Sequence, residues 1–219
     1  MNRPLNIVFC LPGNSYSGNF LKCWHELTIF CLHNNINPIL SQNYSCNIYY
    51  SRTLCLGGNS TLGEFQKPFD NKIDYDYLMW IDSDVIFKPS DLIRLLSHKL
   101  DIVSGLYLTQ NGNNYATVKD WDIDKYKQNG RFDFLTPRDI KNDNLFEVSY
   151  TGFGFILIKK GVFETIKYPW FKPRFIHMDH ITEFTMEDVT FCLEAKEAGF
   201  QIMIDPTVKL GHEKMQLLI

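Results

Sequence analysis

The sequence lacks the features that mark several large protein classes. Its six cysteines form no CxxC pair and no cluster with histidine, so a structural zinc site is not expected. No apolar run approaches the roughly 20 residues that cross a bilayer, and no signal-peptide core follows Met1. The chain has no basic stripe and its formal net charge is −3. We therefore expect no nucleic-acid partner.

Motifs for familiar chemistry are also missing. There is no GxGxxG fingerprint, no P-loop and no GxSxG elbow, which argues against dinucleotide binding, P-loop phosphate binding and serine hydrolysis. We expect a soluble, cytoplasmic protein without a transmembrane segment, in which the cysteines are reduced, buried thiols. The 219 residues, of which 45% are hydrophobic, are enough for a large core without disulfides.

Apolar runs alternate with helical patterns through the first 106 residues. Strands are expected at residues 5–11, 37–40, 77–81 and 101–106, and helices from residue 18, over 47–55 and from residue 89. The polar segment 109–144 predicts loops and a hairpin. Beyond it we expect strands at 147–158, 200–204 and 208–212, and helices at 160–167 and 186–198. Strands that alternate with helices predict an α/β fold with a largely parallel sheet.

Two carboxylates, Asp82 and Asp84, directly follow the apolar run at residues 77–81. The carboxyl end of a buried strand is where open α/β sheets hold ligands. Carboxylate oxygens suit hard cations such as Mg²⁺ or Mn²⁺, and such a cation can bridge to a diphosphate. The structural alternative is a capping turn before the helix that begins at Pro89.

Three later features have both a chemical and a structural interpretation. Glu187-Asp188 opens a helix, where acidic residues are favourable, but a carboxylate there can also act as a general base toward a hydroxyl. His212 follows a strand and is either an ordinary side chain or a metal ligand. The glycines of segment 152–155 permit close approach of the backbone to a ligand, or merely a bulge.

In this order the motifs resemble the GT-A fold glycosyltransferases, and among them the family 2-like group. The shared features are a first strand ending in Pro12-Gly13, Arg52 within a helix, Asp82-Ser83-Asp84 after a strand, Gly152-x-Gly154, Glu187-Asp188 and Gly211-His212. Segments 104–107 and 168–171 are similar too, and the resemblance covers roughly residues 5–212. The opening at 12–18 also resembles the GT-A domain of chlorovirus-type enzymes that glycosylate a capsid protein, which implies the cytoplasm of a host.

The resemblance implies a single Rossmann-like GT-A domain with a mixed, mostly parallel sheet flanked by helices. Residues 1–108 would form the nucleotide-binding half and residues 109–219 the sugar and acceptor half, in a chain that can be one domain of a longer polypeptide. It implies a UDP-sugar donor and Mn²⁺ or Mg²⁺ as cofactor. The residues implied to contact the nucleotide are Leu11, Pro12, Gly13, Arg52, Asp82, Ser83 and Asp84. The residues implied to hold the metal are Asp84, His212 and Asp82.

For catalysis, the resemblance implies an inverting transfer to a hydroxyl of a glycan or glycoprotein. Asp188 would be the general base and Glu187 would orient the sugar or acceptor. The implied substrate pocket contains Gly152, Phe153, Gly154 and Trp170, although Trp170 is equally suited to anchor the core. Two alternatives stay open. One is a sugar-phosphate nucleotidyltransferase, although segment 11–15 lacks the basic residue of that class; the other is an inactive glycan-binding module.

Overall fold

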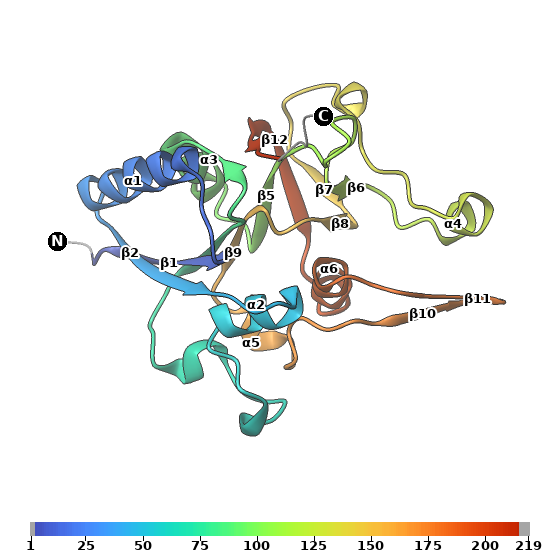
Figure 1. The fold of residues 1–219 in the computed structure, drawn as a ribbon, viewed down its shortest axis with the longest axis horizontal. Coiled ribbons are helices and arrows are strands. Elements are labelled where there is room, and N and C mark those ends of the chain that lie inside the picture. Colours follow the sequence, from blue (N-terminus) through green and yellow to red (C-terminus); the bar gives the residue numbers. More distant parts are fainter. Residues whose placement is uncertain (1–2, 215–219) are drawn as a thin grey trace, which may run out of the picture.

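A seven-stranded sheet in the order β2-β1-β3-β9-β5-β12-β7 forms the centre of the computed structural model, which describes residues 3–214 (Figure 1). Strands β9 and β7 run against their neighbours, and the remaining strands share one direction. The expected α/β fold with a mixed, mostly parallel Rossmann-like sheet is therefore confirmed. The strands are β1 (Leu5–Pro12), β2 (Ile36–Asn43), β3 (Tyr77–Ile81), β5 (Ile102–Leu106), β7 (Phe146–Val148), β9 (Phe155–Lys159) and β12 (Ile202–Lys209).

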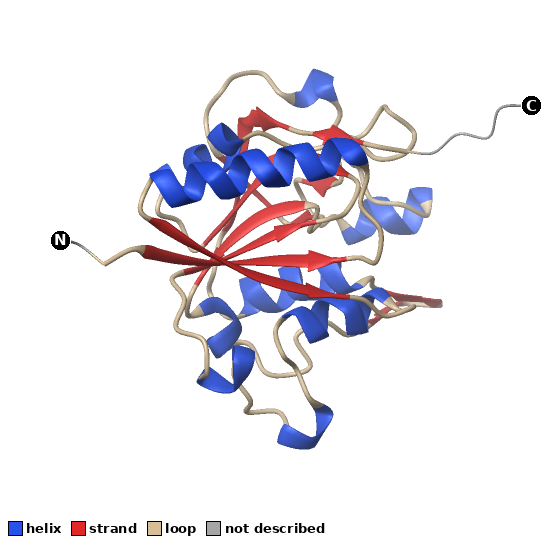
Figure 2. Ribbon diagram, turned by 60° about the vertical axis from the view of Figure 1, so that its left-hand side comes forward, coloured by secondary structure: helices blue, strands red, loops and turns tan. Residues whose placement is uncertain are grey.

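The central strands are apolar on both faces because helices cover both sides of the sheet (Figure 2). Alternate residues separate into two cores: Val8 and Trp80 face one side, whereas Phe9 and Met79 face the other. The helices of the Phe9 side are α1 (Gly18–His33) and α3 (Pro89–Ser97), and those of the Trp80 side are α2 (Ile48–Cys55), α5 (Val162–Thr165) and α6 (Glu187–Glu197).

Smaller elements surround one end of the sheet. The pairs are β4 (Val85–Ile86) with β13 (Gly211–His212), β6 (Thr117–Val118) with β8 (Tyr150–Thr151), and β10 (Phe175–Met178) with β11 (Ile181–Phe184). Helix α4 (Ile123–Asn129) and the β10–β11 hairpin both extend outward on the right of Figure 1. Short 3₁₀ turns occupy Ser60–Leu62, Pro68–Asn71 and Pro137–Asp139.

The structure corrects four expectations. The polar segment 109–144, expected to form loops and a hairpin, contains helix α4. The last strand does not stop before Pro206 but continues as β12, because its register against β5 shifts between Ile204 and Lys209, and that irregular stretch tolerates a residue without an N–H. The expected strand at 147–158 is divided into β7, β8 and β9. The six cysteines are free thiols, but Cys46 is exposed and only the other five are buried.

In the described part of the chain, no helix combines the length and apolar character needed to cross a membrane.

Candidate functional site

The ends of several strands meet at one edge of the sheet. Strand β3 ends at Ile81, and the N–H of Asp82 donates to the carbonyl of Gly154, just before β9, over 3.0 Å. The loop after β1 lies against the same turn, since a Cβ placed on Gly13 would be 3.0 Å from Cβ of Ser83. The expected nucleotide segment at 11–13 and the Asp82–Asp84 turn are thus neighbours.

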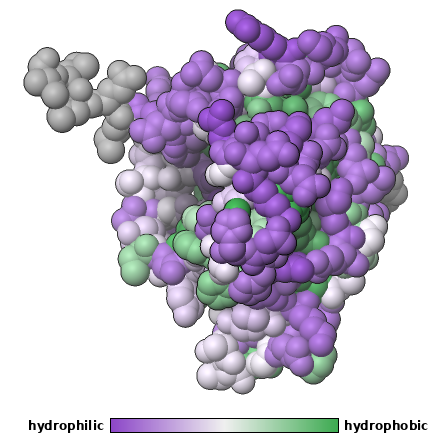
Figure 3. Space-filling model, turned by 90° about the vertical axis from the view of Figure 1, so that its right-hand side faces the viewer, coloured by the Kyte–Doolittle hydropathy of each residue, from purple (hydrophilic) through white to green (hydrophobic). Residues whose placement is uncertain are grey.

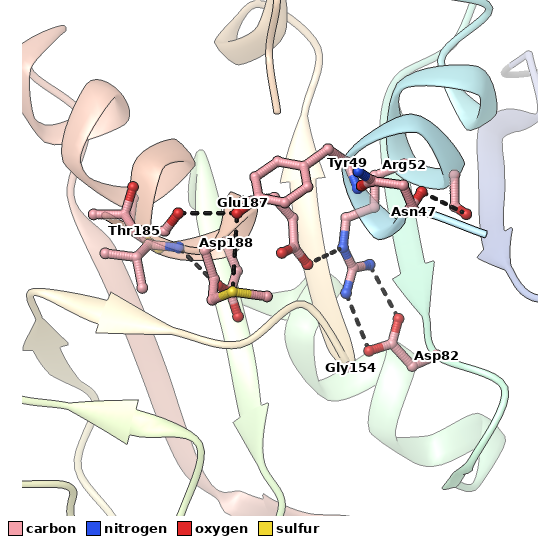
Figure 4. Close-up of polar contacts among 12 residues, drawn as sticks. Asn47, Tyr49, Arg52, Asp82, Gly154, Thr185, Glu187 and Asp188 are labelled. Atoms are coloured by element: carbon pink, nitrogen blue, oxygen red, sulfur yellow. Dashed lines mark hydrogen bonds and ion pairs between the residues drawn. The ribbon is translucent and has the colours of Figure 1, made fainter. Parts of the chain in front are cut away.

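Arg52 joins the two acidic motifs of the chain (Figure 4). It extends from α2, is only 3% exposed, and donates from Nη1 and Nη2 to the two carboxylate oxygens of Asp82, over 3.0 and 3.2 Å. Its Nε donates to Oε1 of Glu187 over 3.0 Å. The guanidinium lies over the ring of Phe153, 5.1 Å from its centroid. One buried cation therefore holds Asp82 and Glu187 together, although they are far apart in the sequence.

Glu187 has unused hydrogen-bonding capacity. Its residue is 4% exposed, and Oε2 has no hydrogen-bond partner among the residues that the structure describes. Buried polar atoms in proteins are nearly always paired, because leaving one unpaired costs about 1–3 kcal/mol. The arrangement suits a ligand hydroxyl that would donate to Oε2.

Asp188 is half-buried at the start of α6. Its Oδ2 accepts a hydrogen bond from the Tyr150 hydroxyl over 3.0 Å. Its Oδ1 accepts a hydrogen bond from the backbone N–H of the next residue, Val189, over 2.8 Å. Burial and the adjacent charge of Glu187 raise the pKa of Asp188 above its ordinary value, against the opposing effect of Arg52. A carboxylate with a raised pKa is a better proton acceptor near neutral pH than an ordinary aspartate.

Asp84 and His212 lie together on the paired strands β4 and β13. Nε2 of His212 is 3.2 Å from Oδ2 of Asp84, and its Nδ1 donates to the carbonyl of Leu108 over 2.5 Å. Lys214, which the sequence argument missed, donates to the same oxygen of Asp84 over 2.5 Å. Burial opposes ionisation of Asp84, but the hydrogen bonds from His212 and Lys214 prevail and lower its pKa to about 2.

This pair fits a divalent cation. A metal-binding histidine usually donates its second ring N–H to a carbonyl, as Nδ1 of His212 does, and Nε2 would then be the atom available to a cation. No group of three or more metal-binding side chains occurs within residues 3–214. The protein would therefore supply two ligands, Asp84 and His212, and substrate oxygens and water the others, as is usual for Mg²⁺-like ions. Asp82 is already engaged through both oxygens with Arg52.

The glycines at 152 and 154 leave space for the side chain of Tyr107, and not for a ligand. A Cβ on Gly152 would lie 2.1 Å from the hydroxyl oxygen of Tyr107, and one on Gly154 would lie 2.6 Å from Cζ of the same ring. That hydroxyl accepts the N–H of Gly154 over 3.0 Å, and the ring packs edge-on against His212. The close approach expected here is therefore to Tyr107, which supports His212.

Two further residues of the expected substrate pocket lie in the core. Trp170 is fully buried and donates from Nε1 to the carbonyl of Phe163 over 3.1 Å. Phe153 is 1% exposed and packs against Trp80, Phe171 and Phe191. Of the two interpretations of Trp170, the structure supports the core anchor.

Solved structures with a similar fold agree with a Rossmann-like, GT-A-like architecture. The protein A197 from STIV aligns with 96% of this chain and 86% of its own length, with a TM-score of 0.56 and 20% identity. GalNAc-T7, solved with UDP, GalNAc and Mn²⁺, aligns with 96% of this chain with a TM-score of 0.55 and 10% identity. This chain spans 44% of the GalNAc-T7 chain. At these identities the similarity concerns the fold alone.

Comparisons by sequence add no relative: no protein-family model and no curated protein matches the chain. An inositol-1-phosphate CTP transferase from T. maritima aligns with a TM-score of 0.43, and we infer nothing from it.

Proposed function

We propose that the protein is a metal-dependent glycosyltransferase that moves a sugar from a UDP-sugar to a hydroxyl of an acceptor, with inversion at the anomeric carbon. The observation that carries the proposal is the contact of Arg52 with both Asp82 and Glu187. It gathers the two acidic motifs at the edge of the sheet where open α/β folds usually bind ligands. The GalNAc-T7 structure, which holds UDP and Mn²⁺ on a similar fold, supports the choice of ligand.

Each half of the chain has its own part in this proposal. Residues 1–108 would hold the nucleotide through Leu11, Pro12, Gly13 and the 82–84 turn, and residues from 109 onward would hold the sugar and acceptor. Asp84 and His212 would bind Mn²⁺ or Mg²⁺, and the ion would supply positive charge against the negative charge that develops on the leaving diphosphate. Lys214 is close enough to Asp84 to contribute a second positive charge there.

Asp188 would take the proton of the acceptor hydroxyl as the oxygen attacks the anomeric carbon. Its raised pKa suits that role, and Tyr150 holds the carboxylate in place. Glu187, fixed by Arg52 through Oε1, would accept a hydrogen bond from a sugar hydroxyl at Oε2. The acceptor would be a glycan or a glycoprotein.

Two variants separate binding from chemistry. Asp84→Ala should lose the metal-dependent part of UDP affinity, whereas Asp188→Asn should keep UDP affinity and lose transfer by roughly 10²–10⁴-fold. The measurements are calorimetric UDP binding and UDP release from UDP-sugars in the presence of a glycan acceptor. Asp143→Asn, an exposed aspartate outside the site, is the matched control. Undiminished transfer by Asp188→Asn would exclude Asp188 as the base.

A further inference from the structure

An aromatic pocket of about 260 Å³ lies beside the candidate base. It lies where α4 and the β10–β11 hairpin approach each other. A hydrogen bond joins these two elements: the Tyr126 hydroxyl donates to Oε2 of Glu183 over 3.0 Å. Figure 3 looks onto this side of the molecule, where hydrophobic residues show between hydrophilic ones. We define the aromatic pocket by six of its lining residues: Trp121, Phe132, Phe134, Tyr150, Met178 and Val189.

The wall of the aromatic pocket leads directly to Asp188. Tyr150 lines the pocket, and its hydroxyl donates to Oδ2 of Asp188 over 3.0 Å. Val189, which also lines the pocket, follows Asp188 in the chain and donates its N–H to Oδ1. A ring bound in the pocket could therefore place a substituent beside the carboxylate of Asp188, which we propose as the base.

The lining favours an aromatic occupant over a bare sugar. Among the described residues around the pocket Glu183 carries the one charge, and it is engaged by Tyr126. A sugar buried there would leave hydroxyls without partners, which is costly. Aromatic side chains form much of the pocket wall. Trp121 stacks on Phe132 with 3.8 Å between ring centroids, and Phe134 packs edge-on against Tyr150 with 6.2 Å between centroids. Rings prefer such offset or edge-on neighbours.

The volume limits the occupant to part of an acceptor. Pockets that enclose a whole drug-sized ligand measure about 300–1,000 Å³, and the aromatic pocket is slightly smaller than this range. It fits one or two rings and leaves the remainder of an acceptor outside.

We propose that the aromatic pocket binds an aromatic ring of the acceptor and presents that ring's hydroxyl to Asp188. The inference rests on the proposed function: it keeps the donor and the base, but makes the acceptor a phenol, either a free compound or a protein tyrosine, in place of a glycan. In the transfer, the phenolic O–H would give its proton to Asp188 while its oxygen forms a bond to the anomeric carbon. The bond from that carbon to the diphosphate oxygen breaks, and the bonding electrons leave with the nucleoside diphosphate.

The test is an NMR titration of the ¹⁵N-labelled protein with four separate probes. Phenol represents a free small molecule and N-acetyltyrosine amide a protein side chain, while cyclohexanol and glucose are the non-aromatic and polar controls. We expect phenol to shift amide signals of segments 117–134 and 176–189. Phe134→Ala should weaken its binding about tenfold. Phe65→Ala, which removes an exposed ring outside the pocket, should not change it.

Each outcome is decisive. If phenol binds more strongly than N-acetyltyrosine amide, the acceptor is a small molecule. If N-acetyltyrosine amide binds more strongly, the acceptor is a tyrosine side chain of a protein. Equal binding of cyclohexanol or glucose, no binding of either phenolic probe, or an unchanged affinity in Phe134→Ala overturns the inference. A UDP titration with Mn²⁺ on the same sample separates the two proposals. If phenol binds and UDP does not, the aromatic pocket is supported and the proposed glycosyltransferase function is contradicted. If UDP binds and phenol does not, only the proposed role of the aromatic pocket is contradicted.

Discussion

Arg52 balances the charge of two carboxylates in a place where water has little access. Removing a buried partner leaves the opposite charge uncompensated, which typically costs about 3–5 kcal/mol. We therefore expect Arg52→Met to lower the free energy of unfolding by about that amount in urea denaturation, because Glu187 would stay buried without its cation. Arg174→Met is the control, since its pair with Glu197 is exposed and should contribute less than about 1 kcal/mol. Equal effects in both variants would contradict the assignment.

In the proposed mechanism, Tyr150 should shift the pH at which sugar transfer begins. Its hydrogen bond favours the ionised form of Asp188 and so opposes the rise in that pKa. A base must be deprotonated, so kcat/KM should increase with pH through the raised pKa of Asp188. In Tyr150→Phe this increase should move to higher pH by up to about one unit.

The matched control for that profile is Tyr75→Phe. Like Tyr150→Phe, it removes a partly buried hydrogen bond from a tyrosine to a carboxylate. The lost bond is the one to Glu164, over 2.6 Å, which lies outside the candidate site. This substitution should cost stability without moving the pH profile. A Tyr150→Phe profile identical to that of the wild type would show that Asp188 does not limit the rate.

The junction of β8 and β9 is shaped around Tyr107. Gly152→Ala would bring a methyl group within 2.1 Å of the Tyr107 hydroxyl oxygen, so we expect a loss of about 1–3 kcal/mol in unfolding free energy. Tyr107→Phe removes that oxygen, and the double variant should be more stable than the sum of the single losses by about 0.5 kcal/mol or more. Gly18→Ala, where the added methyl meets nothing within 4 Å, is the control. Strict additivity would contradict this packing.

Asp205 ties α3 to β12 and should give the protein a measurable acid sensitivity. Its buried carboxylate accepts from Nε of Arg94 over 2.7 Å and lies 2.6 Å from Nε2 of His98. Burial opposes ionisation, but hydrogen bonds from Thr207, His98 and Arg94 prevail and lower the pKa to about 2.

Because the folded pKa is lowered, the stabilisation is present above the unfolded value of about 3.9 and is lost as pH falls toward 2. Wild-type unfolding free energy should fall by about 2 kcal/mol more between pH 6 and pH 2.5 than that of Asp205→Asn. Asp143→Asn should behave as the wild type. A parallel pH dependence in wild type and Asp205→Asn would refute the contribution of Asp205.

The elements that the sequence predicts well are those whose signals are local. The apolar run at 77–81 and the glycine after α6 are sufficient to place β3 and the end of that helix. The passage of β12 through Pro206 was missed, because a proline normally excludes a central strand and only the register shift against β5 permits it. The exposure of Cys46 likewise depends on how its loop packs, which has no local signal.

Across the molecule, the candidate site combines segments from both ends of the chain. Asp84, Asp188 and His212 are candidates from the sequence because of their residue types and the order of the motifs. Their grouping could not be derived, because it depends on long-range contacts: Arg52 with Glu187, and the pairing of β13 with β4. Lys214 was missed for the same reason, since a lysine near the end of a chain carries no signal of its contact with Asp84.

The central claim is that this edge of the sheet binds a nucleoside diphosphate together with a divalent cation held by Asp84 and His212. The most direct test is calorimetric titration of UDP with and without Mn²⁺, on the wild type and on Asp84→Ala. We predict that Mn²⁺ strengthens UDP binding to the wild type at least about tenfold, a gain of about 1.4 kcal/mol, and that Asp84→Ala abolishes this gain. UDP affinity that is independent of Mn²⁺, or a gain that survives in Asp84→Ala, would contradict the account.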